Sequence, residues 1–209
     1  MTDFSDLVRG YHRFRDRDYT RQHARWMELA ESQSPRVMVV ACADSRTDPA
    51  LVFDAAPGEI FVVRNIAALV PPFEEGGGRH GVSAAIEFAV NQLEVPEIVI
   101  MGHGSCGGVN AALTQNFAGL PNGEGGFIGH WVDLLDTARD RIVAEHGTGP
   151  EATRELELET IRVSLTNLRT FPRVAEREAA GELTLRGAYF AIRDGVLWVM
   201  DESGTFAPA

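Results

Sequence analysis

Two short motifs, each placed directly after an apolar run typical of a buried strand, constrain this chain more than any other feature. Residues 42–46 read C-A-D-S-R and follow the run 37–41, and residues 103–108 read H-G-S-C-G-G and follow the run 98–101. Uninterrupted apolar runs of this length are typical of strands buried on both faces of a parallel sheet. The segments that follow such strands meet at one edge of the sheet, and ligands bind there where the strand order reverses. We therefore expect Cys42, His103 and Cys106 to converge at that edge.

These three residues are the kinds of side chain that bind zinc. Two thiolates and an imidazole supply three ligands, one fewer than a structural zinc site uses, and an open fourth position is typical of a catalytic site. Taken singly, each has a plainer explanation, since free cysteines are often buried as inert thiols and a histidine can be a hydrogen-bonded core residue. Their shared position after two strands, with the spacing H-x-x-C, favours zinc. The chain has no C-x-x-C motif of the kind used in thiol redox chemistry.

A carboxylate and a guanidinium lie beside the first cysteine. Asp44 and Arg46 are two residues apart, so in an extended segment their side chains point to the same side. Next to a metal, such a pair can hold the carboxylate in place and allow it to accept a proton from bound water. An ordinary ion pair at a strand end is the alternative, but the position beside Cys42 favours the catalytic role.

The order of elements along the chain predicts an α/β fold. Strands are expected at 36–41, 59–64 and 97–102, helices after Asp48-Pro49 and at 80–93, 106–115, 127–146 and 151–170, and a hairpin at 183–200 around Asp194-Gly195. Alternating strands and helices form an open, mainly parallel sheet flanked by helices. We expect the strand order 2-1-3-4 with a C-terminal antiparallel edge strand. Residues 1–209 are interpreted as a single domain, whose residues 1–33 form an N-terminal helical arm of two helices, the second opening near Thr20.

Charge and composition narrow the classes of partner. The net charge of −11 argues against nucleic-acid binding, because neutralising phosphates requires clustered Lys and Arg, and it also argues against binding to an anionic membrane surface. No apolar run is long enough to span a membrane. The acidic first residues lack the apolar segment of a signal peptide. A cytoplasmic location is therefore expected.

The two motifs together resemble those of the β-class carbonic anhydrases. The similarity extends over nearly the whole chain and includes Pro57-Gly58-Glu59 and Arg64-Asn65-Ile66-Ala67. Residues 33–35 and 69–72 are similar to the plant-type branch, whose active site stays open. The resemblance implies an enzyme with one zinc ion per subunit that converts carbon dioxide reversibly into bicarbonate and a proton, through zinc-bound hydroxide oriented by an Asp–Arg pair. It also implies a homodimer or larger homo-oligomer, with the N-terminal helices reaching over the partner subunit.

The resemblance assigns a role to each site residue. The implied roles are zinc ligation by Cys42, His103 and Cys106, catalysis by Asp44 and Arg46, and substrate binding by Gln33, Phe61, Ile66, Phe88 and the N–H of Gly107. The apolar residues among these would line a carbon dioxide pocket built from both subunits. Phe88 departs from the family pattern, which has Tyr there, so a hydroxyl near the pocket is lost. Without the resemblance, Phe61, Ile66 and Phe88 are ordinary core residues.

The same residues are compatible with two other functions. Relatives with this fold and zinc site hydrolyse carbon disulfide or carbonyl sulfide, and pocket access, not the motifs, decides between these substrates. A zinc-bearing homologue without turnover could serve as a binding protein, although the intact Asp44–Arg46 pair argues against this.

Relatives differ in how the zinc site is regulated. In one group the Asp closes the site at low pH, helped by bicarbonate bound to a Trp, an Arg and a Tyr. Here Arg64 matches the Arg, but Val39 and Phe190 occupy the other two positions, and neither can donate a hydrogen bond. We therefore expect an open site in which Arg46 holds Asp44 away from zinc.

Overall fold

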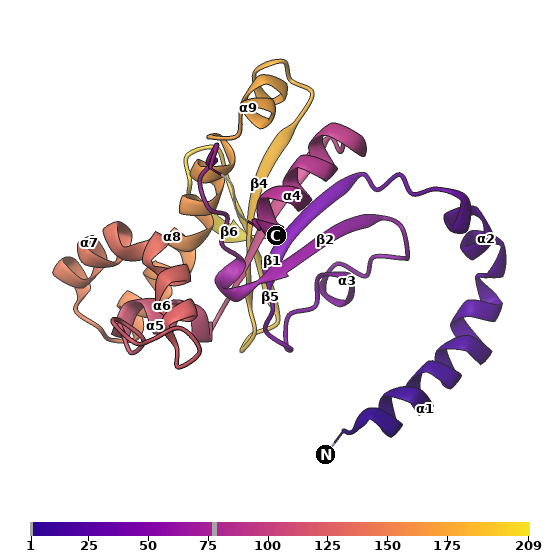
Figure 1. The fold of residues 1–209 in the computed structure, drawn as a ribbon, viewed down its shortest axis with the longest axis horizontal. Coiled ribbons are helices and arrows are strands. Elements are labelled where there is room, and N and C mark those ends of the chain that lie inside the picture. The colour runs from indigo at the N-terminus through magenta and orange to yellow at the C-terminus, as the bar shows by residue number, and fades with distance from the viewer. Residues whose placement is uncertain (1, 77–78) are drawn as a thin grey trace. The chain divides into compact units, whose positions relative to one another are not determined.

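The structure, a computed structural model, describes residues 2–76 and 79–209 (Figure 1). The chain divides into two units, residues 1–34 and 35–209. The larger unit contains a sheet with the strand order β2-β1-β3-β4-β5-β6. Its strands are β1 (Val37–Cys42), β2 (Ile60–Asn65), β3 (Glu97–His103), β4 (Thr184–Ala191), β5 (Val196–Met200) and β6 (Phe206–Pro208). β1 to β4 pair in parallel, β5 pairs antiparallel with β4, and β6 pairs antiparallel with β5. This confirms the predicted fold class and the order 2-1-3-4.

The C-terminal end of the sheet has one strand more than the sequence predicts. The expected hairpin forms, with Ala191 opposite Val196 and Gly195 at φ 66°, a backbone conformation that glycine adopts without steric cost. β5 then pairs with the three-residue strand β6. The outer antiparallel strand is therefore β6, which is too short to show a period in the sequence.

One face of the sheet is covered by helices that bury the largest apolar core. These are α4 (Gly81–Glu87), which continues into the π-helical turn η3 (Phe88–Gln92), α8 (Pro150–Leu168) and α9 (Pro172–Ala179). Alternate residues of the central strands, such as Met38 of β1 and Ile100 of β3, are fully buried with Ile161 of α8 in this core. Removal of these apolar side chains from water holds α8 against β3 and β4.

The opposite face is covered less completely. Its small core consists of Val39, Ala41, Met101 and Ala188. The short helix α3 (Pro49–Val52) begins as the sequence predicts, with Asp48 accepting hydrogen bonds as its N-cap and Pro49 at the first position. Val62 pairs with Val39 and Val199 pairs with Ala188, so both valines lie on this same face. Val62 is 38% exposed and Val199 is 40% exposed, so part of the apolar surface of this face is uncovered.

A third apolar cluster lies beyond the carboxyl ends of β1 and β3. It contains α5 (Gly107–Thr114), α6 (Gly126–Val132), α7 (Asp136–His146) and the first half of α8. The sequence predicts one helix at 127–146, but the structure interrupts it with the 3-10 turn η4 (Asp133–Leu135). No Gly or Pro lies between residues 130 and 146, so the sequence does not mark this break.

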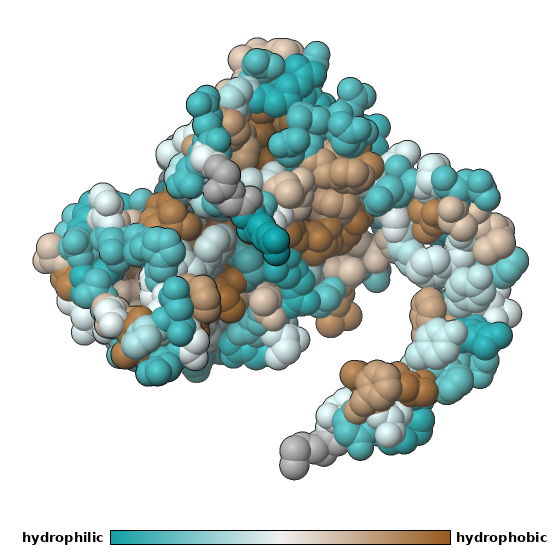
Figure 2. Space-filling view, viewed as in Figure 1, coloured by the Kyte–Doolittle hydropathy of each residue, from teal (hydrophilic) through white to brown (hydrophobic). Residues whose placement is uncertain are grey.

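The N-terminal unit contains the two predicted helices, α1 (Phe4–Phe14) and α2 (His23–Glu31), joined through the π-helical segment η1 (Arg15–Tyr19). Phe14 and Trp26 make an edge-to-face contact with ring centroids 5.8 Å apart. One face of α1 exposes apolar side chains, with Phe4 79% and Leu7 61% exposed (Figure 2). In the part of the chain that the structure describes, none of the helices is long and apolar enough to cross a membrane.

Candidate active site

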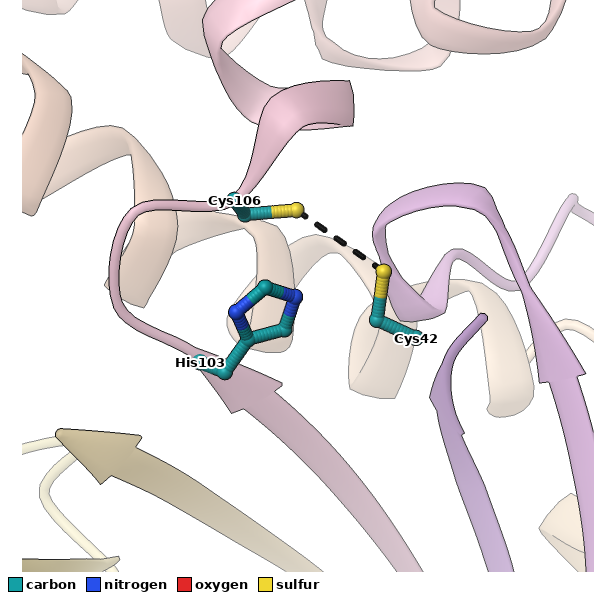
Figure 3. Close-up of side chains that lie close together, drawn as sticks. All are labelled: Cys42, His103 and Cys106. Carbon is teal, nitrogen blue, oxygen red and sulfur yellow. Dashed lines mark hydrogen bonds between the residues drawn. The ribbon is translucent and has the colours of Figure 1, made fainter. Parts of the chain in front are cut away.

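The three predicted zinc ligands converge at the carboxyl ends of β1 and β3 (Figure 3). Cys42 is the last residue of β1, His103 is the last residue of β3, and Cys106 is the N-cap of α5. Because β1 and β3 are adjacent and parallel, their ends meet and the three buried side chains point toward one another. Their ligand atoms all lie within 4.8 Å of one another. The residues therefore form one buried group, which we call the ligand group.

The geometry of the ligand group fits a tetrahedral zinc ion. With Zn–S bonds of about 2.3 Å, two tetrahedral thiolate ligands have sulfurs about 3.8 Å apart, and the sulfurs of Cys42 and Cys106 are 3.9 Å apart. Nδ1 of His103 lies 2.9 Å from the carbonyl oxygen of Gly104, which assigns the ring proton to Nδ1 and leaves a lone pair on Nε2. Among the described residues, this Nε2 is the one buried side-chain nitrogen or oxygen without a hydrogen-bond partner.

The Cys42 and Cys106 sulfurs lie within hydrogen-bond distance of each other, and either one can be the donor. The hydrogen bond from Cys106 lowers the pKa of Cys42 to about 4, although burial opposes the shift. The same hydrogen bond, together with burial, raises the pKa of Cys106. For His103, burial disfavours the charged ring, but the neighbouring Cys42 sulfur and the hydrogen bond to Gly104 outweigh it and raise the pKa. A metal ion bound to both sulfurs would take the place of this hydrogen bond, because thiolates are the ligating form.

Asp44 and Arg46 form a fork-shaped ion pair beside the ligand group. Nε of Arg46 donates to Oδ1 of Asp44 at 2.9 Å, and Nη2 donates to Oδ2 at 2.7 Å. These hydrogen bonds hold the pKa of Asp44 well below its usual range. Oδ2 of Asp44 lies 4.0 Å from Nε2 of His103, so an ionised carboxylate faces the ligand group. Nη2 of Arg46 also donates to the carbonyl oxygen of Ser105 at 3.0 Å.

Arg64 holds the backbone of the first motif. From β2, its Nε donates to the carbonyl oxygen of Cys42 at 2.9 Å and its Nη2 to that of Asp44 at 2.6 Å. Its Nη1 donates to the Asp48 carboxylate at 2.9 Å. Every nitrogen of this guanidinium is therefore engaged within the chain.

Sequence reasoning missed a buried carboxylate that contacts the second motif. Glu157 of α8 accepts a hydrogen bond from the backbone N–H of Cys106 at 3.1 Å and one from the Tyr189 hydroxyl at 2.7 Å. Burial raises the pKa of Tyr189, and the carboxylate raises it further. Its position on the helix could have identified it. Glu157 precedes the buried Ile161 by four residues, so it lies on the helix face that packs on the core, where carboxylates are rare.

Two of the predicted substrate residues lie away from the ligand group of their own chain. Phe61 of β2 stacks on Phe88 with ring centroids 5.8 Å apart. Phe88 is 44% exposed, and hydrophobic surface gathers over β2 and α4 in Figure 2. Phe61 pairs in register with Met38, four residues before Cys42, which corresponds to about 13 Å along a strand. Gln33, a third predicted substrate residue, belongs to the N-terminal unit.

Ile66 and Gly107 lie next to the ligand group. Gly107 is the first residue of α5, where backbone N–H groups have no partner inside a helix. Ile66 begins the turn η2 (Ile66–Ala68), and a Cβ added at Gly108 would come within 2.5 Å of its Cγ2, so this glycine is needed for the close approach. Ile66 also borders a recess of about 420 Å³ lined by Asn65, Phe127, Ile128 and Trp131. Sequence reasoning did not identify this recess.

Known sequences resemble the chain over most of its length. A family model described as carbonic anhydrase matches residues 37–197. The chain is 36% identical over 196 residues to β carbonic anhydrase 6, mitochondrial, of Arabidopsis thaliana, covering 92% of this chain and 66% of that protein. It is 34% identical over 197 residues to β carbonic anhydrase 3 of the same plant, covering 92% of this chain and 75% of that protein. The chain thus spans just under two thirds of the first of these relatives and three quarters of the second.

Solved structures with the same fold are also similar. The structure of the β-carbonic anhydrase CcaA superposes with a TM-score of 0.91 at 26% sequence identity and covers 100% of both chains. One of two tetrameric β-carbonic anhydrases from the filamentous ascomycete Sordaria macrospora superposes with a TM-score of 0.83 at 26% identity and covers 98% of both chains.

Proposed function

This chain belongs to the β-carbonic anhydrase family, and from that premise we propose that it catalyses the zinc-dependent, reversible hydration of carbon dioxide to bicarbonate and a proton. The observation that carries the proposal is the buried ligand group with the Asp44 carboxylate 4.0 Å from Nε2 of His103. Three protein ligands leave one position of a tetrahedral ion open for water, as in other catalytic zinc sites.

One zinc ion per subunit would be held by Cys42, His103 and Cys106. When bound, zinc lowers the pKa of a coordinated water and so supplies a nucleophile near neutral pH. The two thiolates of this chain offset the charge of the ion, so we expect a smaller effect than in sites with three neutral imidazoles. The hydrogen bond from Nδ1 of His103 to Gly104 keeps Nε2 directed toward the two sulfurs (Figure 3).

The Asp44–Arg46 pair would orient the nucleophile and keep the site open. Both oxygens of Asp44 are held by Arg46, and the lone pairs that remain on Oδ2 can accept a hydrogen bond from a water at the fourth position. The same two bonds oppose rotation of the carboxylate onto the ligand group. This restraint supports the assignment to the open-site, plant-type branch.

We propose that the substrate pocket is shared between two subunits. Carbon dioxide is small and uncharged, so apolar side chains with a few donors suffice to bind it. Ile66 and the N–H of Gly107 would form the side next to the ligand group, and Gln33, Phe61 and Phe88 of the partner copy would form the other side. The position of Phe61, four residues before Cys42 along the paired strands, supports this division.

A homodimer or larger homo-oligomer is part of the same proposal. Stable monomers rarely expose large contiguous apolar patches. The N-terminal unit exposes the apolar face of α1, and the sheet of the larger unit separately exposes Val62 and Val199. The relative from Sordaria macrospora is described as tetrameric.

Zinc content and carbon dioxide hydration, measured together on the purified protein, test the proposed function. We expect one zinc per chain and hydration detectable by stopped flow with a pH indicator. Zinc without hydration, but with hydrolysis of carbonyl sulfide or carbon disulfide, would assign the alternative substrates. Zinc with neither activity would indicate a binding protein, and absence of zinc would contradict the proposal.

A further inference from the structure

A single peptide group in the second motif is held at both of its ends by side chains from distant parts of the chain. The carbonyl oxygen of Ser105 accepts a hydrogen bond from Arg46 at 3.0 Å, and the N–H of Cys106 donates to Glu157 at 3.1 Å. These two atoms belong to the same peptide unit, in which C=O and N–H point in opposite directions because the bond is trans. The peptide is therefore clamped between the Asp44–Arg46 pair and α8.

The loop that carries this peptide needs such support. Ser105 has φ 55°, a left-handed conformation that is unfavourable for a residue with a Cβ. The loop also lies close to the partner of Glu157, since a Cβ added at Gly104 would come within 2.8 Å of the Tyr189 hydroxyl oxygen. A small rotation of the Ser105–Cys106 peptide would move the Cys106 sulfur relative to Cys42 and His103.

Burial of Glu157 is costly, which makes a purely incidental contact a poor explanation. The residue is 4% exposed, and a buried carboxylate is tolerated only when it is well hydrogen-bonded or paired. Both of its oxygens are used, one by Cys106 and one by Tyr189. The neighbouring cation, Arg154, lies over the Tyr189 ring with its guanidinium carbon 3.8 Å from the centroid, and within the described residues Glu157 itself forms no ion pair.

We propose that Glu157 is a positioning residue that fixes the Ser105–Cys106 peptide, and thereby holds the Cys106 sulfur ready for zinc and the Ser105 carbonyl ready for Arg46. The inference rests on the proposed zinc function of the ligand group. Hydrogen bonds at the two ends of one amide strengthen each other by polarisation. Loss of the acceptor on Glu157 should therefore loosen both the metal ligand and the anchor of the Asp44–Arg46 pair.

The test compares zinc binding by wild type, Glu157→Leu and Glu157→Gln. Leucine keeps most of the volume but removes the acceptor, whereas glutamine keeps an oxygen that can accept from Cys106. Thr160→Val is a matched control, because Thr160 is buried on the same helix and its hydroxyl bonds within that helix, to the carbonyl of Leu156 at 2.7 Å. Zinc affinity is measured by competition with a chromophoric chelator, and ligand geometry by the absorption spectrum of the Co²⁺-substituted protein.

We expect Glu157→Leu to weaken zinc binding about 10- to 100-fold, as is usual when a group that orients a metal ligand is lost, and to alter the cobalt spectrum. Glu157→Gln and Thr160→Val should stay close to wild type in zinc affinity and in the cobalt spectrum. Equal zinc affinity of Glu157→Leu and Thr160→Val would overturn the proposal. Equal losses in Glu157→Gln and Glu157→Leu would overturn it too, since the acceptor would then not be the feature that matters.

A second variant covers the case in which Glu157→Leu does not fold. Tyr189→Phe removes one of the two hydrogen bonds of the carboxylate, so zinc binding should weaken relative to Thr160→Val, and equal affinity would overturn the proposal. A wild-type protein that binds zinc but does not hydrate carbon dioxide would contradict the proposed function alone. In that case the zinc affinities of the variants would still show whether Glu157 positions the Ser105–Cys106 peptide.

Discussion

Nη2 of Arg46 lies 3.0 Å from the carbonyl oxygen of Ser105, although 59 positions separate the two residues in the chain. The same nitrogen donates to Oδ2 of Asp44 at 2.7 Å. One guanidinium therefore ties the carboxylate of the first motif to the loop of the second. The orientation of Asp44 and the position of Cys106 depend on each other through this contact.

The fork shape of Arg46 is expected to matter more than its charge. Lysine keeps the charge in Arg46→Lys but cannot make the two parallel bonds to Asp44, so the carboxylate loses its fixed orientation. We expect kcat/KM for carbon dioxide hydration to fall about 100-fold, as is typical of a small misplacement of a reacting group, while zinc content stays unchanged. Arg193→Lys, in the exposed turn between β4 and β5, is the control. Full activity of Arg46→Lys would contradict this role.

Cys106 is expected to be required for metal retention. Cys106→Ser replaces a buried thiolate with a hydroxyl that stays protonated, so the ligand group keeps only two good zinc ligands. Zinc measured by metal analysis after gel filtration, and hydration activity, should both be lost. The control is His130→Gln, because His130 is exposed and paired with Asp133 rather than with the ligand group. Stoichiometric zinc with full activity in Cys106→Ser would refute the assignment.

Removal of residues 1–30 is expected to weaken assembly and activity together. The deleted segment carries the exposed apolar face of α1 and most of α2, which we propose to cover the partner subunit. A milder variant, Leu7→Asp, places a charge on that face, and Arg13→Ala on the opposite face is its control. Light scattering measures the mass of the assembly at the concentration used in the activity assay. An active monomer would show that activity needs neither the N-terminal arm nor assembly.

Bicarbonate is expected to inhibit this enzyme without cooperativity. All nitrogens of Arg64 are engaged within the chain, Val39 is buried, and neither Val39 nor Phe190 has a side-chain donor. Initial rates measured at increasing bicarbonate should therefore follow a simple hyperbolic decline near neutral pH. A sigmoidal decline that steepens as the pH is lowered would contradict the open-site interpretation.

Asp201 in the turn between β5 and β6 is expected to make part of the stability acid-sensitive. Hydrogen bonds from the Ser203 side chain and from the N–H of Thr205 lower its pKa in the folded protein. A lowered folded-state pKa means that this stability is fully present above the ordinary value of 3.8 and is lost as pH falls through the folded value. Asp201→Asn keeps an acceptor but cannot titrate, so the stability gap between wild type and this variant should shrink in acid. Urea unfolding at several pH values measures the stability of both proteins. A difference in stability that does not change with pH would contradict this role of Asp201.

Much of the fold could be predicted because its causes are local. Apolar runs marked β1 and β3, Asp48 and Pro49 marked the start of α3, and Asp194-Gly195 marked the hairpin of β4 and β5. The strand β6 and the interruption at η4 could not be predicted. The first is too short to show a period, and the second carries no breaker residue.

The sequence by itself determined which chemical groups lie at the carboxyl ends of β1 and β3, because residue identity and spacing along a strand place Cys42, His103 and Cys106 at one sheet edge. Only the tertiary structure decided what holds them there. Glu157 is 51 positions from Cys106 and reaches it because α8 packs closely on the sheet. A Cβ added at Gly102 or Gly187 would come within 2.9 or 3.0 Å of Ile161 side-chain atoms, so both glycines are needed for that approach. Contacts of this kind depend on how a helix sits on a sheet, and that geometry arises from packing among residues distant in the sequence.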